Sequence, residues 1–137
     1  GIALLVELAK TAAKTFPDAD IEIIEKHHNR KLDAPSGTAL MIADAISETR
    51  EESEYVYDRH DVRKKREPRE IGISAIRGGS IIGEHEVLFA GTDEVLTISH
   101  SASSRELFAT GALRAAEFII GKPAGMYNMD NMFEGII

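Results

Sequence analysis

The sequence has no cysteine and no tryptophan, and aromatic residues make up only 6% of its 137 positions. Without cysteine the chain forms no disulfide and no thiolate metal site, which fits a reducing compartment, so we expect a cytoplasmic protein. Few aromatic rings predict a core of aliphatic side chains and alanine. No apolar run approaches the roughly 20 residues that cross a bilayer, so we expect no membrane span.

The sequence also has fewer basic than acidic residues. The chain has 16 Lys and Arg against 23 Asp and Glu, a formal net charge of −7. A nucleic-acid surface needs a basic excess, so we expect no nucleic-acid partner. A length of 137 residues with 43% hydrophobic content is enough for one core, and residues 1–137 are expected to form a single domain.

Residues 21–46 are the most informative stretch. Ile21, Ile23 and Ile24 are β-branched and predict a strand. Ser36 stands where a helix N-cap belongs, and apolar residues follow it at helical spacing (Ala39, Ile42, Ala43 and Ile46). A strand, a loop and a helix are therefore expected here.

The loop between them carries titratable groups. His27 and His28 can exchange protons near neutral pH, and Lys31 supplies a proton or a fixed positive charge. This combination is typical of a site whose ligand gains or loses a proton. The alternative, a solvated basic loop, stays open for each residue taken alone.

The helix start predicts an anion site. The first backbone N–H groups, at Ser36, Gly37 and Thr38, have no partner within the helix and lie at its positive dipole end. Gly37 has no side chain, so a ligand can approach the main chain closely. Together with the loop, this indicates a pocket for a small molecule with carboxylates. An ordinary helix cap is the alternative.

The other elements are read from periodicity. Residues 1–13 predict a helix with one apolar face (Ile2, Leu5, Leu8, Ala9 and Ala12), and 71–99 predict three strands. We therefore expect an α+β fold with an open mixed four-stranded sheet covered by helices on one face. In residues 49–70, 14 of 22 positions are charged, which favours a solvated, mobile surface excursion over a binding segment. Ser103 or Ser104 is expected to cap a last helix with a buried stripe (Leu107, Phe108, Gly111, Ala115, Phe118 and Ile119).

Further histidines and arginines are weaker candidates. Residues 84–86, Glu-His-Glu, alternate faces on a strand, so too few ligands converge for a metal and none is expected. His85 and His100 are interpreted as strand residues that satisfy hydrogen bonds. Three arginines can each clamp a carboxylate or pair with the acidic excess (Arg77, Arg105 and Arg114).

Residues 25–39 resemble the signature of the dihydrodipicolinate reductase family, with Glu, His-His, Lys and then Asp-Ala-Pro-Ser-Gly-Thr-Ala in the same order. Residues 71–79, 83–87, 99–105 and 108–116 also follow in the order that this family shows. The resemblance covers nearly the whole chain, although relatives have glycines in the segment where this chain has Asp58, His60, Asp61 and Lys64.

The resemblance implies an enzyme of lysine and diaminopimelate biosynthesis that reduces a cyclic dicarboxylate with NADH or NADPH. It implies His27 as the acid/base, Lys31 as the partner proton donor and His28 as a carboxylate ligand, with Ser36, Gly37 and Thr38 holding a carboxylate. Arg114 falls on the helix that the family places near the cleft between its domains.

The resemblance also implies what lies outside this chain. No Gly-x-Gly-x-x-Gly follows a strand, so we expect the cofactor on an N-terminal dinucleotide-binding domain that is absent here, and no reductase activity from this domain alone. The family's tetramer implies a homo-oligomer formed through the sheet, with Ile71, Ile73 or their neighbours facing outward. The alternative function is a non-catalytic dicarboxylate-binding or oligomerisation module.

Overall fold

The fold comes from a computed structural model, which describes residues 1–134. The chain divides into two compact units, residues 1–101 and 102–137. No helix among the described residues is long and apolar enough to cross a membrane. The elements are α1 (Ile2–Thr15), β1 (Asp20–His27), α2 (Gly37–Ser47), β2 (Glu54–Val56), β3 (Glu70–Arg77), β4 (Gly83–Ala90), β5 (Val95–Ala102), α3 (Glu106–Ile119) and α4 (Met129–Phe133).

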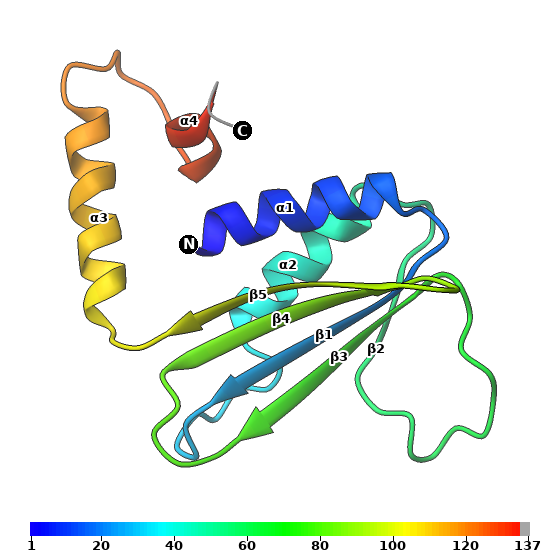
Figure 1. Cartoon of the computed structure of the whole chain (residues 1–137). Helices are drawn as coiled ribbons and strands as arrows, with labels where there is room; N and C mark the ends of the chain where they lie inside the picture. Colours follow the sequence, from blue (N-terminus) through cyan, green and yellow to red (C-terminus); the bar gives the residue numbers. More distant parts are fainter. Residues whose placement is uncertain (135–137) are drawn as a thin grey trace. The chain divides into compact units, whose positions relative to one another are not determined.

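The sheet is mixed, as expected, but it has five strands instead of four, in the order β2-β3-β1-β4-β5 (Figure 1). β1 lies at its centre, parallel to β3 and antiparallel to β4. The additional strand is β2, a three-residue segment that pairs in parallel with β3. So short a strand, inside a charge-rich segment, has no periodicity that a sequence pattern can detect.

α1 and α2 cover one face of this sheet (Figure 1). Alternate residues of the strands point into the core beneath them, so Ile21 and Ile23 of β1 are fully buried. β3 pairs in register with β1, Ile21 opposite Ile71 and Ile23 opposite Ile73. The prediction that Ile71 or Ile73 faces outward is therefore wrong, because this register places both in the core with their partners.

The two helices confirm most of the expected pattern. In α2 all four predicted residues are fully buried, and Ser36 caps the helix by accepting a hydrogen bond from the Ala39 N–H. In α1, Leu5, Ala9 and Ala12 are buried. Leu8 is 40% exposed, contrary to prediction, and Ala13 is buried instead. The face that meets the sheet is rotated slightly from the one that the apolar residues predict.

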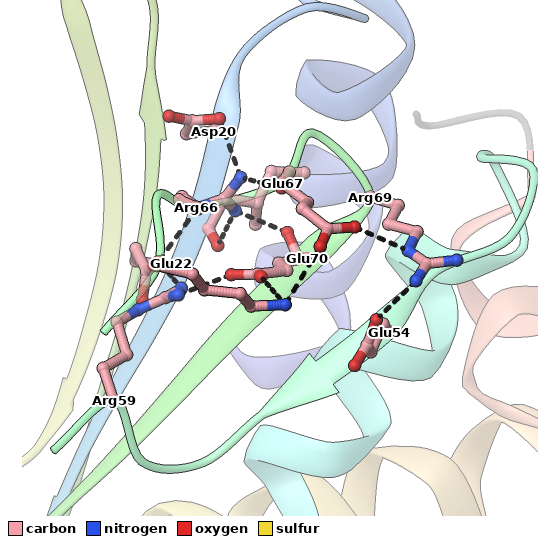
Figure 2. Close-up of polar contacts among 10 residues, drawn as sticks. Asp20, Glu22, Glu54, Arg59, Arg66, Glu67, Arg69 and Glu70 are labelled. Atoms are coloured by element: carbon pink, nitrogen blue, oxygen red, sulfur yellow. Dashed lines mark hydrogen bonds and ion pairs between the residues drawn. The ribbon is translucent and has the colours of Figure 1, made fainter. Parts of the chain in front are cut away.

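The charged segment is held to the sheet by ion pairs (Figure 2). Arg66 donates to Asp20 and to Glu22, and Arg59 donates to Glu22 and to the buried carboxylate of Glu70. The hydrogen bond from Arg59 is the main cause that holds the pKa of Glu70 at about 2. Residues 49–70 are thus anchored to the sheet at several points and contribute a strand, which corrects the expectation of a wholly solvated excursion.

The second unit consists of α3 and α4. The Ser104 hydroxyl accepts a hydrogen bond from the Glu106 N–H at the start of α3, but the N-cap residue is Arg105, so the prediction that Ser103 or Ser104 caps this helix is not confirmed. None of the residues of α3 is buried, and Phe108 and Ile119 are each about half exposed. The predicted buried stripe is therefore wrong for this structure, because periodicity marks an apolar face but does not supply a partner for it.

Candidate active site

The predicted loop leaves the carboxyl end of the central strand. The carbonyl oxygen of His27 accepts a hydrogen bond from the Gly78 N–H, and the Asn29 N–H donates to the Gly79 carbonyl oxygen, which ties the loop to the end of β3. The loop continues through a cis Ala34–Pro35 peptide to Ser36 at the start of α2. The Ser36 N–H donates to the carboxylate of Glu25 on β1, which holds the strand and the helix start together.

Glu25 is the centre of the site. Its side chain is fully buried, two residues before His27 on the same face of β1. Its carboxylate accepts hydrogen bonds from His27 Nδ1 at 2.6 Å, from the Ser36 N–H at 2.9 Å, and from both terminal nitrogens of Arg77 at 2.7 Å. One carboxylate therefore connects the histidine, the helix start and β3.

The surroundings of Glu25 keep it ionised. Burial raises its pKa, but the hydrogen bonds from Arg77, His27 and the Ser36 N–H lower it more, and the net pKa lies below the usual range. The same pairing raises the pKa of Arg77. Arg77 thus pairs with an acid of the protein, the second of its two predicted roles, and it also donates to the Asp33 carbonyl oxygen at 2.7 Å.

A second buried group lies beside His27. His85 on β4 is 4% exposed, and its ring meets that of His27 edge to face at a centroid distance of 5.3 Å. Its Nε2 is 3.0 Å from the Ser36 hydroxyl. Burial is the main cause that lowers the pKa of His85 to about 4, and the nearby charges of His27 and Lys31 add to it. His85 is therefore neutral at physiological pH.

Lys31 borders the same group of residues. Its ammonium group forms an ion pair with Asp33 at 2.8 Å, and its side chain is 21% exposed. Its charge helps to lower the pKa of His85, so it lies within electrostatic reach of that ring. His28 follows β1 directly and is half-buried.

The helix start is open on one side. A Cβ built on Gly37 meets no atom within 4 Å, and Gly37 is exposed. Ser36 is only 2% exposed, and its hydroxyl already hydrogen-bonds the Ala39 N–H and His85. The structure therefore leaves the main chain at Gly37 and Thr38 as the accessible part of the predicted anion site.

The structure gathers His27, Ser36 and Arg77 around Glu25, which the sequence reading did not assign to the site. His85 was interpreted as a hydrogen-bonded strand residue, which is confirmed, but its position beside His27 was missed. The one available signal was an acid two residues before a histidine on a strand, a spacing that places both on one face. Arg105 and Arg114 belong to the second unit, and their proposed roles stay predictions.

Residues 84–86 alternate as predicted: Glu84 pairs with Lys26 at 3.0 Å, whereas His85 points into the core. Within residues 1–134, no group of three or more His, Asp or Glu side chains is arranged to hold a metal ion. The arrangement of Glu25, His27 and Ser36 supports proton transfer beside the main-chain N–H groups at the start of α2.

Residues 1–133 match the family model described as the C-terminus of dihydrodipicolinate reductase, and the chain belongs to this family of reductase domains. Particular relatives carry the name 4-hydroxy-tetrahydrodipicolinate reductase. The protein from Caldanaerobacter subterraneus subsp. tengcongensis is 59% identical over 133 residues, and that from Staphylococcus carnosus 52% over 132. Each match covers 96% of this chain, and 53% and 54% of the relative.

A solved structure agrees with this assignment. The dipicolinate-bound dihydrodipicolinate reductase from Paenisporosarcina sp. TG-14 superimposes with a TM-score of 0.66 at 34% identity, over 82% of this chain and 43% of that one. The chain thus spans about half the length of the curated relatives it matches.

Proposed function

We propose that this chain is the substrate-binding and proton-donating half of a 4-hydroxy-tetrahydrodipicolinate reductase, acting in lysine and diaminopimelate biosynthesis. The observation that supports this most directly is His27, held by the buried carboxylate of Glu25 next to the open start of α2. A proton donor and an anion site then lie side by side, as the reduction of a cyclic dicarboxylate requires. A cysteine-free chain also suits the cytoplasm, where we place the enzyme.

The substrate is proposed to bind through its carboxylates. The N–H groups of Gly37 and Thr38 hold one carboxylate at the positive end of α2, with Ser36 supporting the helix start, and His28 binds a carboxylate as well. Arg114 is a further candidate ligand on α3. The structural relative described above contains dipicolinate, a planar dicarboxylate, which is consistent with this class of ligand.

The protein's part in the reaction is to supply a proton. Hydride that reaches the ring carbon of the substrate leaves negative charge on the ring, and a positioned acid lowers the barrier by neutralising it. His27 is the proposed acid/base, and Lys31 is the partner proton donor. Glu25 and Asp33, the partners of these two groups, keep both side chains in place.

The hydride comes from NADH or NADPH, which the described residues do not fit. The β1–α2 connection, residues 28–36, contains no glycine, and none of the strand-to-helix connections in residues 1–134 carries a Gly-rich phosphate-binding turn. We therefore propose that a dinucleotide-binding domain outside this chain holds the cofactor.

A non-catalytic module that binds dicarboxylates is the second candidate, because this chain carries the anion site and not the cofactor site. Calorimetric titration of the chain separates the parts of the proposal. Dipicolinate should bind, the His28→Ala variant should bind it more weakly, and NADPH should not bind. The intact full-length protein should oxidise NADPH in the presence of substrate. An intact protein that binds dipicolinate without oxidising NADPH would establish the module instead.

We further propose that the chain forms a homo-oligomer, a tetramer, through the face of its sheet that α1 and α2 do not cover. Strand alternation places Ile24, Ile76 and Leu88 on this face, and Ile76 is 45% exposed. Light scattering at micromolar concentration should therefore give a mass above that of the monomer. A monomeric mass throughout an about tenfold dilution series would exclude this face as the assembly surface.

A further inference from the structure

We propose that Glu25 is the positioning carboxylate of the site: it fixes the protonated Nδ1 of His27 and leaves Nε2 as the atom that exchanges a proton with the substrate. This inference rests on the proposed function and assigns a role that the family signature by itself does not. Arg77 and the Ser36 N–H serve it by keeping Glu25 charged and immobile.

The first step of the argument concerns which nitrogen carries hydrogen. An ionised carboxylate only accepts hydrogen bonds, so the 2.6 Å contact between Glu25 and Nδ1 of His27 requires a hydrogen on Nδ1. The other ring nitrogen, Nε2, then carries the exchangeable proton. In residues 1–134 no hydrogen bond to Nε2 occurs, and the His27 side chain is 12% exposed.

The second step concerns the charge on Glu25. One oxygen accepts from the Ser36 N–H and Arg77 Nη2, and the other accepts from His27 Nδ1 and Arg77 Nη1. Both oxygens are therefore saturated, and the carboxylate has no freedom to rotate. The bidentate pair with Arg77 supplies the opposite charge that a fully buried carboxylate needs.

The third step concerns the orientation of the His27 ring. His85 packs edge to face against it at 5.3 Å, and Gly83 on β4 lies beside Nε2, where a Cβ would come within 3.1 Å. These neighbours restrict the ring without competing for its Nε2 atom. The position and tautomer of the His27 ring are therefore set by residues of β1 and β4, and the charge of Glu25 is held by Arg77 of β3.

The decisive variant is Glu25→Gln in the intact full-length protein. Glutamine has nearly the same shape, but it carries no charge and presents a donor in place of one oxygen, so it supports the His27 cation poorly and permits the other tautomer. We expect kcat to fall about a hundredfold with KM changed less than about threefold. The alkaline limb of the kcat–pH profile should also move, because a charge beside the acid/base group is lost.

Glu84→Gln is the matched control. It also removes a carboxylate from a carboxylate–cation pair, with Lys26, but on the opposite face of the sheet, so kcat and the pH profile should stay at the parent values. A Glu25→Gln variant with parental kcat and an unmoved alkaline limb would overturn the inference. If the parent protein itself had no reductase activity, the proposed function would be contradicted instead.

A second measurement does not depend on the variant folding. Nitrogen NMR of the parent protein, with isotope-labelled histidine and the His27→Gln variant for assignment, identifies the protonated ring nitrogen. We expect the neutral His27 ring to carry its hydrogen on Nδ1. A ring protonated on Nε2 alone would contradict the positioning role, because an ionised Glu25 then has no hydrogen to accept.

Discussion

His27→Ala should lower kcat of the intact full-length protein by about a hundredfold or more, the usual loss when one acid/base group is removed. The expected cause is that the proton reaching the substrate ring must then come from water, with no group held in position to deliver it. Steady-state kinetics with NADPH and substrate measure the effect. A kcat within a few-fold of the parent value would show that another residue is the proton donor.

Lys31→Ala is expected to lower kcat to a similar extent, because its ammonium group is the partner donor. His28→Ala should act mainly on KM, because His28 is assigned to binding a carboxylate. His60→Ala is the control, since this histidine lies in the charged segment with its side chain 87% exposed. Comparison of the His27 and His28 variants tests whether the first residue transfers the proton and the second binds the substrate.

Acidification from pH 7 to 5 should destabilise the fold through His85. Its folded-state pKa is about 4 against an ordinary value of 6.5, so the unfolded chain binds more protons between these pH values. The stabilising contribution is complete above pH 6.5 and is lost as the pH falls toward 4. Linkage gives a loss of about 2 kcal/mol in the free energy of unfolding between pH 7 and 5.

Urea denaturation of the chain at the two pH values measures this loss. His85→Gln should remove most of the difference between them, although it also lowers the stability at pH 7 by weakening the contact with Ser36. His60→Gln, at an exposed site, should keep the full difference. If His85→Gln retained the parental pH dependence, the buried histidine would not be the group responsible.

Local patterns in the sequence predicted the elements that carry the site. Each of these patterns spans only a few residues, and the structure confirms all of them: the β-branched run around Ile21, the Ser36 cap, and the spacing of Ile42 and Ile46. The same local rules failed for β2, because a three-residue strand takes its conformation from β3 and not from its own composition. Leu8 shows that an apolar residue near the edge of a helical face can remain exposed.

Local sequence patterns could not predict the contacts inside the site, and the reason is physical. Glu25 meets Arg77 52 residues along the chain, and Ser36 meets His85 49 residues along it. Contacts of this separation depend on strand order and register, which a single sequence does not specify. The hydrogen bond from Arg66 to Asp20, 46 residues apart, could not be predicted from the sequence for the same reason.

The central place of β1 has a consequence for the order in which the domain is made. β1 is synthesised before either of its sheet partners, because its parallel neighbour starts at Glu70 and its antiparallel neighbour ends only at Ala90. Until then the nascent chain presents an unpaired strand bearing Ile21 and Ile23, with both backbone edges open to association with other chains. The loop that carries His27 and Lys31 is thus made before the strands that bear its supporting partners, Arg77 and His85.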